Sequence, residues 1–256
     1  MQVVDNIKEL KALVREFKAG GRTIGLVPTM GYLHDGHLSL MQQARKEQEA
    51  VVVSIFVNPL QFGPQEDYDR YPRDVAHDTE LAAGAGVDVC FTPAVSEMYP
   101  GGRGAMLTDV NVRRITDGLC GAARPGHFRG VATVVAKLFN IVQPDGAYFG
   151  QKDAQQVAVI RQMAADLNMD VRIVAVPTVR EKDGLAMSSR NTYLNPAERS
   201  AALVLSRALK MAAGMLNGGE RRAAKITTAV HEFIGREPLA QLEYGVLCHP
   251  RTLAEL

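Results

Sequence analysis

Two histidines three residues apart lie where a predicted strand runs into a predicted helix. The strand covers 23–27, and the segment V-P-T-M-G-Y-L-H-D-G-H (27–37) then places His34, Gly36 and His37 at the start of a helix. The free N–H groups and the dipole of a helix N-terminus favour an anion. Imidazoles one turn apart can add hydrogen bonds to phosphate oxygens, so the segment predicts an anion site. A metal half-site and a pair of solvated loop histidines remain as alternatives.

A second strand-to-helix junction carries a lysine. The segment Y-F-G-Q-K-D (148–153) ends a predicted strand, turns at Gly150 and starts a helix near Lys152. A cation at a helix start is locally unfavourable by about 0.3–1 kcal/mol, which Asp153 partly offsets. A bound phosphate would give the lysine a use at this position. The plain alternative is that Lys152 points into water.

A third group of donors lies in a polar connector, in the segment A-M-S-S-R-N (186–191). Two hydroxyls and one guanidinium in a loop can bind phosphate oxygens directionally. These donors are Ser188, Ser189 and Arg190. The alternative is an ordinary polar linker in which Asn191 and Asn195 form turns.

A long aperiodic segment follows the predicted strand 51–57. Its sixteen residues, N-P-L-Q-F-G-P-Q-E-D-Y-D-R-Y-P-R (58–73), are many for a loop in a compact domain, which favours an active-site role or a disordered insertion. Three aromatic residues, Phe62, Tyr68 and Tyr71, favour the first of these. At the strand's exit, Asn58 and Gln61 carry neutral amides suited to a substrate hydroxyl or carboxylate.

Three further side chains are placed to join these groups. Gln156 lies one helical turn past Lys152 and can face the same space. Arg124 and His127, in the segment A-R-P-G-H-F, come directly before another predicted helix and add a possible anion contact.

The elements that must position these residues alternate between strand and helix. The expected strands are 23–27, 51–57, 87–92, 147–149 and 171–176, after a short apolar start at 1–4. The expected helices are one capped by Asp5 and ended by Gly20–Gly21, then 37–48, 73–83, 128–141 and 153–168. This order predicts an α/β fold, a Rossmann-like parallel sheet with helices on both faces. Ligands of such sheets collect at the carboxyl ends of the strands, where the residues above lie.

The pattern changes after Pro177. A connector over 178–195 leads to a helix that starts at Pro196 and ends near Gly218–Gly219, followed by a helix over 221–234 and a strand over 242–248. These elements predict a smaller C-terminal α+β domain. The expected domains are therefore 1–178 and 179–256.

Composition excludes several classes of protein. With 46% hydrophobic residues, 22% charged residues and a net charge of +1, the 256-residue chain is neither disordered nor charged for nucleic-acid binding. Its densest apolar run, 51–57, is far shorter than the ~20 residues that span a bilayer, and charged residues fill the start of the chain. Three cysteines, Cys90, Cys120 and Cys248, show neither disulfide nor zinc spacing. We expect a cytoplasmic protein without a nucleic-acid or membrane partner.

The histidine pair and the distant serine–arginine loop together resemble the H-I-G-H and K-M-S-K-S pair of the nucleotidylyltransferase superfamily, whose motif is H-x-G-H. Longer strings narrow the resemblance to the pantothenate synthetase (pantoate–β-alanine ligase) family. They are V-P-T-M-G-Y-L-H-D-G-H, S-I-F-V-N-P-L-Q-F, Y-P-R, R-P-G-H-F-R-G-V, Y-F-G-Q-K-D-A-Q-Q and D-G-L-A-M-S-S-R-N, in the family's order between 24 and 194.

The resemblance implies a homodimeric enzyme that condenses (R)-pantoate with β-alanine and uses ATP and Mg²⁺. The products would be pantothenate, AMP and pyrophosphate, formed through a pantoyl-adenylate. One candidate ligand for the magnesium ion is Asp78, in the helix after Y-P-R. Two other functions stay open: transfer of AMP or CMP to a phosphate by the same fold, and nucleotide binding without turnover.

The resemblance also implies a role for individual residues. Contacts to ATP would come from Met30, Gly31, Tyr32, Leu33, His34, Asp35, Gly36, His37, Gly150, Gln151, Lys152, Asp153, Val179, Met187, Ser188, Ser189 and Arg190. Within this set His37 is the residue usually assigned as proton donor. Gln61 and Gln156 would bind pantoate, with Asn58, Tyr71, Arg124 and His127 as further substrate contacts.

The chemistry requires charge on the phosphates to be stabilised, and six residues could supply donors and positive charge. They are His34, His37, Lys152, Ser188, Ser189 and Arg190. We expect the small domain to close over ATP as a lid. Two features depart from the family pattern: Gln151 stands where Glu is usual, and the sequence ends at Leu256, which leads us to expect a shortened lid domain.

Overall fold

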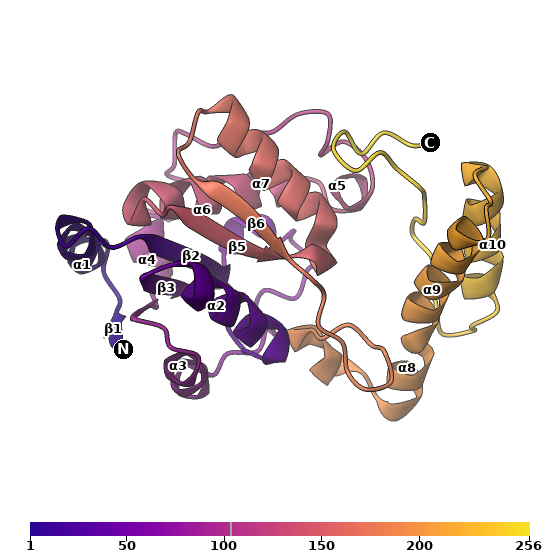
Figure 1. Ribbon diagram of the computed structural model, residues 1–256, viewed down its shortest axis with the longest axis horizontal. Coiled ribbons are helices and arrows are strands. Elements are labelled where there is room, and N and C mark those ends of the chain that lie inside the picture. Colours follow the sequence, from indigo (N-terminus) through magenta and orange to yellow (C-terminus); the bar gives the residue numbers. More distant parts are fainter. Residues whose placement is uncertain (103) are drawn as a thin grey trace. The chain divides into compact units, whose positions relative to one another are not determined.

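The computed structural model describes residues 1–102 and 104–256, which form two compact units, Met1–Thr178 and Val179–Leu256. The first unit contains a six-stranded sheet in the order β1-β4-β3-β2-β5-β6, and every pairing in it is parallel (Figure 1). Its strands are β1 (Gln2–Val4), β2 (Ile24–Thr29), β3 (Ala50–Ile55), β4 (Val89–Phe91), β5 (Gly146–Gly150) and β6 (Arg172–Val176). The predicted α/β fold with a parallel sheet is confirmed.

The register of the central strands brings the ends of three strands to one edge. β2 and β3 pair in step from Ile24 with Ala50 to Thr29 with Ile55, so both strands end at the same level. β5 joins the other side of β2 through Gly25 paired with Gly146. The segments that leave β2, β3 and β5 therefore start at the same carboxyl edge of the sheet, where a ligand site is expected.

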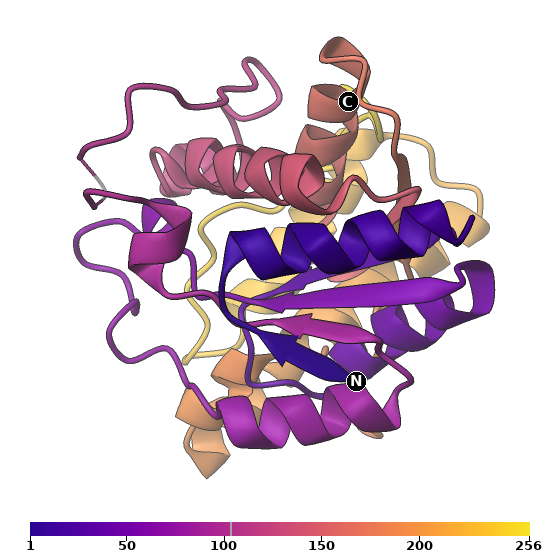
Figure 2. The same cartoon turned by 90° about the vertical axis from the view of Figure 1, so that its left-hand side faces the viewer.

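Helices cover both faces of this sheet. One face packs against α1 (Ile7–Ala19), α6 (His127–Val142) and α7 (Ala154–Asp166), and the other against α2 (Asp35–Glu47) and α3 (Val75–Gly84) (Figure 2). The alternation of side chains along β3 explains the two layers, since Val52 packs on the first face and Val51 and Val53 on the second. All six residues of β3 are buried, as is typical of a central parallel strand.

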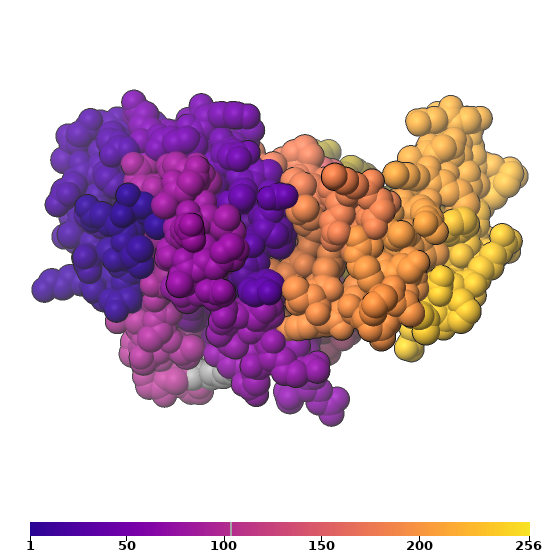
Figure 3. Space-filling view, turned by 90° about the horizontal axis from the view of Figure 1, so that it is seen from below, coloured from indigo at the N-terminus to yellow at the C-terminus, as the bar shows by residue number. Residues whose placement is uncertain are grey.

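The short elements lie in the connections, close to the edges of the sheet. They are η1 (Pro59–Gln61), α4 (Val95–Met98), α5 (Cys120–Ala123) and η2 (Gln151–Asp153). In the space-filling view, indigo residues of the N-terminus share one face with magenta residues from the middle of the sequence, as the pairing of β1 with β4 requires (Figure 3).

At two helix starts, the cap explains a difference from the sequence prediction. Asn6, and not Asp5, caps α1, because the Asn6 side chain accepts a hydrogen bond from the Glu9 N–H at 2.8 Å. Helix α2 begins at Asp35, two residues before the predicted start at His37, because His34 acts as its N-cap.

The second unit consists mainly of helices. They are η3 (Ser189–Tyr193), α8 (Pro196–Ala201), α9 (Leu203–Asn217) and α10 (Ala223–Gly235). α9 and α10 pack around Val204, Ala208 and Ile234. The single helix expected from Pro196 is interrupted at Ala202.

The strand expected at 242–248 is wrong. These residues form one isolated antiparallel bridge, between Cys248 and Glu255, and no ladder with another strand of the described residues. An apolar run becomes a strand only where a neighbour takes up its backbone hydrogen bonds. The second unit, as far as it is described, is therefore helical and not α+β. No helix among the described residues is long and apolar enough to cross a membrane.

Candidate active site

The segment that follows β2 is held by a buried carboxylate. Gly31 and Tyr32 have positive φ angles of 84° and 51°, which turns the backbone sharply toward α3. Asp78 of α3 is 1% exposed, and its two oxygens accept hydrogen bonds from the N–H groups of Tyr32 at 2.8 Å and Leu33 at 2.6 Å. Both oxygens thus serve the loop, so we correct the assignment of Asp78 as a magnesium ligand.

A glycine is required at the first position of this turn. A Cβ atom on Gly31 would lie 2.8 Å from Oδ2 of Asp78 and 2.9 Å from Cγ2 of Ile55, in addition to the strain of its positive φ. The loop can therefore pack against both β3 and α3. Burial raises the pKa of Asp78 although the two backbone hydrogen bonds oppose this shift.

The two histidines form a capping box at the start of α2. Nδ1 of His34 accepts a hydrogen bond from the Gly36 N–H at 3.1 Å, and Nδ1 of His37 accepts one from the His34 N–H at 3.3 Å. Their rings lie with centroids 4.1 Å apart. A ring nitrogen that accepts a hydrogen bond carries no proton, so in both neutral rings the proton is on Nε2. The pair offers two N–H donors in fixed positions.

These imidazoles are uncharged at neutral pH. Burial lowers the pKa of His37 to about 3, and the nearby His34 and Lys152 lower it further. Burial and then Lys152 also lower the pKa of His34, against the opposing charge of Asp35 at the first position of α2. Of the donors and positive charge expected from the predicted group, the two histidines therefore offer the donors. The helix start is also less open than expected, because His34 already binds the Gly36 N–H.

Lys152 is the positively charged residue of the predicted site. It lies in η2 directly after β5, with its side chain 41% exposed and its Nζ 3.6 Å from Oδ1 of Asp153. Its charge acts on both His34 and His37, so the lysine lies close to the imidazole pair. Two segments that are far apart in the sequence thus act on one another through charge, and a phosphate site shared by them stays a prediction. Gly150 and Gln151 complete this turn.

The segment after β3 is ordered around a buried amide. Asn58 is 1% exposed, and both sides of its amide are hydrogen-bonded within the protein, to Tyr99, Leu60, Gln61 and Gly130. Such a side chain positions its neighbours, whereas the sequence placed Asn58 against substrate. Nε2 of Gln61 lies 3.2 Å from Sδ of Met30, so Gln61 meets the loop that follows β2.

Arg124 and His127 tie this segment to the start of α6. Arg124 forms two hydrogen bonds to the carboxylate of Glu66, at 2.9 and 2.5 Å, which lower the pKa of that carboxyl. Nη1 of Arg124 lies 3.3 Å from Nε2 of His127, whose Nδ1 lies 2.9 Å from the backbone oxygen of Gln61. The charge of Arg124 is thus already balanced, and both residues hold the loop on which Gln61 lies.

Aromatic packing orders the rest of the 58–73 segment. Tyr71 is buried, and its ring meets that of Phe62 edge-on at 6.0 Å, while Tyr68 meets Phe62 at 5.4 Å. The segment is therefore a structured loop, and Tyr71 is part of its interior.

Two adjacent glutamines at the start of α7 differ in their surroundings. Gln155 binds the 115–120 segment, donating to the backbone oxygens of Ile115 and Gly118 and accepting from the Cys120 N–H. Sequence reasoning missed this role, because nothing in the local pattern identifies the distant partner. Gln156 is half-buried, and its contact with substrate remains a prediction.

In the second unit, the predicted donors Ser188, Ser189 and Arg190 directly follow a short hairpin. The N–H of Met187 donates to the backbone oxygen of Val179 at 3.1 Å, and Arg180 and Ala186 form a bridge. Oγ of Ser188 then accepts the N–H of Arg190 at 3.3 Å and caps η3. The connector is therefore a folded loop that gathers Val179, 187–190 and their neighbours, and not a plain linker.

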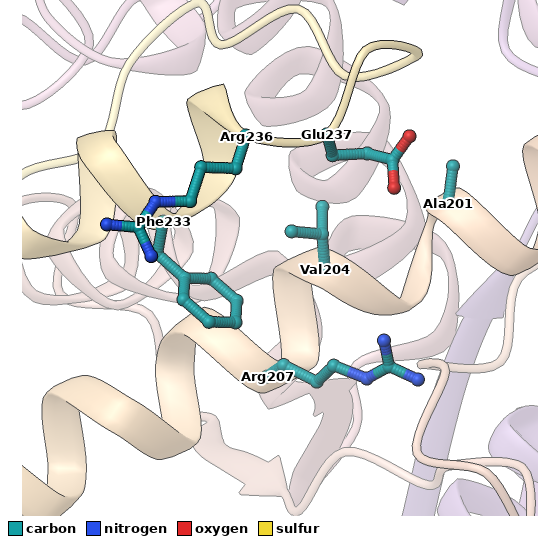
Figure 4. A pocket seen from close by; sticks show the side chains of 6 residues that line it. All are labelled: Ala201, Val204, Arg207, Phe233, Arg236 and Glu237. Carbon is teal, nitrogen blue, oxygen red and sulfur yellow. The ribbon is translucent and has the colours of Figure 1, made fainter.

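The second unit also contains a pocket between its helices. Its lining residues are Ala201, Val204, Arg207, Phe233, Arg236 and Glu237 (Figure 4). Their side chains come from α8, α9 and the C-terminal end of α10. None of them is among the predicted site residues.

The described residues contain no group of three His, Cys, Asp or Glu side chains that could hold a metal ion. Mg²⁺ in nucleotide enzymes is usually bound by substrate phosphates, water and one or two carboxylates.

An open parallel sheet with fixed donors at its carboxyl edge defines an α/β protein with an anion site, the class that includes nucleotide-binding enzymes. Residues 2–256 match the model of the pantoate-beta-alanine ligase family, and the chain belongs to this family. The resemblance inferred from the motifs is confirmed.

Two similar proteins are both pantothenate synthetases. Pantothenate synthetase from Pelotomaculum thermopropionicum is 60% identical over 244 residues, which are 95% of this chain and 86% of that protein. The pantothenate synthetase of a Thermoanaerobacter species is 58% identical over 256 residues, 100% of this chain and 89% of that protein.

Solved structures agree with these relatives. A crystal structure of pantothenate synthetase from Thermus thermophilus matches with a TM-score of 0.94 and 49% identity, covering 100% of this chain and 90% of that one. Pantoate-beta-alanine ligase from Francisella tularensis, complexed with beta-gamma ATP and beta-alanine, matches with a TM-score of 0.78 and 36% identity. That match covers 91% of this chain and 86% of the other.

Proposed function

We propose that this protein condenses (R)-pantoate with β-alanine, using ATP, to give pantothenate, AMP and pyrophosphate. Membership of the pantoate-beta-alanine ligase family supports this ligase activity. The observation that carries the chemistry is the pair of neutral imidazoles beside Lys152 at the carboxyl edge of the sheet. ATP and β-alanine as substrates agree with the complex of the Francisella relative.

In the first step, the carboxylate of pantoate attacks the α-phosphorus of ATP, and pyrophosphate leaves. A carboxylate is already ionised at neutral pH, so this step needs no base. Negative charge on the phosphates and the leaving pyrophosphate must be stabilised. Lys152 supplies a positive charge, and the Nε2–H groups of His34 and His37 supply two oriented donors.

His37 acts in this proposal as a hydrogen-bond donor and does not transfer a proton. An imidazole with a pKa of about 3 is neutral near pH 7: it keeps its Nε2–H but lacks the second, acidic proton of an imidazolium ion. Donors that are fixed before the reaction need no reorganisation when charge develops, which is the main source of their effect.

In the second step, the amine of β-alanine attacks the acyl carbon of the adenylate, and AMP leaves. Gln61 and Gln156 bind pantoate in this proposal, and no side chain becomes covalently attached. The position of Gln61 beside Met30 supports its place next to the nucleotide loop, which includes residues 30–37.

The proposal extends to residues that no observation yet tests. Val179, Met187, Ser188, Ser189 and Arg190 bind nucleotide, the second unit acts as the lid, and magnesium enters with ATP as part of the substrate. The enzyme works in the cytoplasm as a homodimer. Three free cysteines support a reducing compartment, and the homodimer rests on the family resemblance alone.

The test is AMP formation with ATP, pantoate and β-alanine, and with each of the three left out in turn. We expect AMP only with the complete mixture, and exchange of labelled pyrophosphate into ATP only with pantoate. Exchange that requires a phosphorylated acceptor instead would identify a nucleotidylyltransferase. Binding of ATP and pantoate without AMP release would identify a non-catalytic binding protein.

A further inference from the structure

The buried amide of Asn58 can adopt only one orientation. The N–H of Leu60, which can only donate, lies 3.3 Å from Oδ1 of Asn58. The backbone oxygen of Gly130, which can only accept, lies 3.1 Å from Nδ2 of the same side chain. If the amide were flipped, its nitrogen would face the N–H of Leu60 and its oxygen would face the backbone oxygen of Gly130. Neither pair can form a hydrogen bond, so these two backbone groups decide the orientation.

That orientation passes to two more side chains. The second hydrogen on Nδ2 of Asn58 points to Oε1 of Gln61 at 3.1 Å, so this oxygen of Gln61 is occupied on the inner side. The Tyr99 hydroxyl, 2.7 Å from Oδ1 of Asn58, must then donate. A chain of hydrogen bonds therefore runs in one direction, from Tyr99 through Asn58 to Gln61.

The start of this chain is rigid. Tyr99, directly after α4, is fully buried, and its ring packs at 5.9 Å from Phe56. The backbones also approach closely, because a Cβ on Gly130 would lie 2.3 Å from the backbone oxygen of Leu60. Helix α6 and η1 are therefore packed directly against each other. The amide of Asn58 could turn only if this contact were broken.

The nitrogen end of the buried Gln61 amide faces the loop that follows β2. Its Nε2 faces Sδ of Met30 at 3.2 Å, and a thioether sulfur is only a weak acceptor. A carboxylate or hydroxyl oxygen of a substrate would be a far better partner for the same N–H groups.

We propose that Tyr99 is a positioning residue: it helps the backbone groups of Leu60 and Gly130 to hold Asn58 in place, and Asn58 in turn makes Gln61 a hydrogen-bond donor toward an oxygen of the acid substrate. The inference rests on the proposed function, since that function makes a hydroxy acid the substrate. It assigns Tyr99 a role in substrate affinity, although its own side chain is buried.

The first test compares two substitutions of Gln61 by the KM for pantoate. Gln61→Ala removes the donor, and we expect the KM to rise about 10- to 100-fold, as for a lost hydrogen bond to a charged group. Gln61→Glu keeps the shape but presents an acceptor, so we expect a further loss of about tenfold. If Gln61→Glu binds pantoate as well as the wild type, Gln61 acts as an acceptor and the inference is wrong.

The second test asks whether Tyr99 acts through Gln61. Tyr99→Phe should raise the pantoate KM about 5- to 20-fold, and leave the KM for ATP within about twofold. The matched control is Tyr148→Phe, which removes a hydroxyl from another fully buried tyrosine whose partners are Gln48 and Glu47. This control should leave the pantoate KM unchanged.

A double-mutant cycle separates positioning from a general structural effect. In the Gln61→Ala background, Tyr99→Phe should have no further effect on the pantoate KM, because the group through which it acts is gone. Equal effects of Tyr99→Phe in both backgrounds would overturn the inference. If Tyr99→Phe fails to fold, the comparison of Gln61→Glu with Gln61→Ala still decides the direction of the hydrogen bond.

Failure of the inference is distinguishable from failure of the proposed function. A wild-type protein that forms no AMP with pantoate contradicts the function. An active wild-type protein with an active Gln61→Glu variant contradicts only the direction assigned to Gln61.

Discussion

The segments that follow β2 and β5 leave the same edge of the sheet but are built in opposite ways. After β2, the carboxylate of Asp78 holds the backbone of Tyr32 and Leu33, and a capping box fixes both histidines. After β5, Lys152 is 41% exposed and pairs with Asp153 at 3.6 Å. The imidazoles of the first segment are neutral and fixed, whereas the lysine of the second is charged and exposed.

This difference indicates how the two segments divide the work. Fixed neutral donors favour one arrangement of phosphate oxygens, because they are oriented before the substrate binds. An exposed lysine is a point charge on a flexible stem, which can follow the phosphates as pyrophosphate leaves. The site therefore combines an oriented part with a mobile charge, and the substitutions below test each part.

The largest effect is expected at Lys152. Lys152→Ala removes the positive charge that is proposed to stabilise the negative phosphates. The adenylation rate should therefore fall by about 10²- to 10³-fold. Pre-steady-state release of pyrophosphate measures this rate. Lys8→Ala, at an exposed lysine on α1, is the control and should leave the rate unchanged. An unchanged rate in Lys152→Ala would contradict the role of Lys152 as the charge that acts on the phosphates.

The next largest effect is expected at His37, where two substitutions test the imidazole donors that the capping box fixes. Asn can still accept the His34 N–H at the place of Nδ1, but it offers no donor at the place of Nε2. His37→Asn should therefore fold normally and adenylate about 10- to 100-fold more slowly. Gln can place an N–H near the position of Nε2, so His37→Gln should keep more activity than His37→Asn. The reverse order of activity would contradict the assignment of Nε2 as the donor.

Asp78 tests whether the loop must be held. Asp78→Asn replaces one acceptor oxygen by a donor that faces a backbone N–H, so it should lower the free energy of unfolding by about 1–3 kcal/mol. We expect the KM for ATP to rise about tenfold, since the loop 30–37 loses its anchor. Urea denaturation and initial rates measure the two effects. Asp170→Asn at an exposed aspartate is the control, and a normal ATP affinity in Asp78→Asn would show that the loop does not need this support.

The smallest effect concerns pH. In the unfolded chain a histidine binds a proton near pH 6.5, whereas the folded protein keeps His37 unprotonated down to about pH 3. The unfolded state then binds more protons between these values, so stability falls as the pH falls from 7 toward 3. The lowered pKa values of His34 and His127 act in the same direction.

His37→Asn removes one of these groups and should reduce the loss of stability between pH 7 and pH 5 by about 2 kcal/mol. Urea unfolding of wild type and variant at the two pH values measures the difference. Identical pH dependence in the two proteins would mean that His37 titrates normally in the folded state.

The strands that carry this site can be predicted from the sequence, whereas most hydrogen bonds between its distant parts cannot. The strands β2, β3 and β5 are short apolar runs, and their local patterns identify both the sheet and the edge where His37 and Lys152 meet. The same reasoning predicts a strand at 242–248, but a strand also needs a partner, which the local pattern does not reveal.

The positioning residues depend on contacts between distant parts of the chain. Asp78 reaches Leu33, Tyr99 reaches Asn58 and Gln155 reaches Cys120, across loops that carry no regular pattern. Residue type and spacing therefore identify the groups that face a substrate, whereas the groups that orient them become visible only in the fold. The charge of the histidines belongs to this second kind, because burial sets it.

The most direct test of the account is the protonation of His34 and His37 in the folded protein at pH 7. Long-range ¹H–¹⁵N correlation spectra of histidine-labelled protein distinguish the two ring nitrogens, and His34→Asn and His37→Asn variants assign the signals. We predict that both rings are neutral, with the proton on Nε2. A doubly protonated ring, or a proton on Nδ1 of either residue, would contradict the claim that the site presents two neutral donors fixed by a capping box.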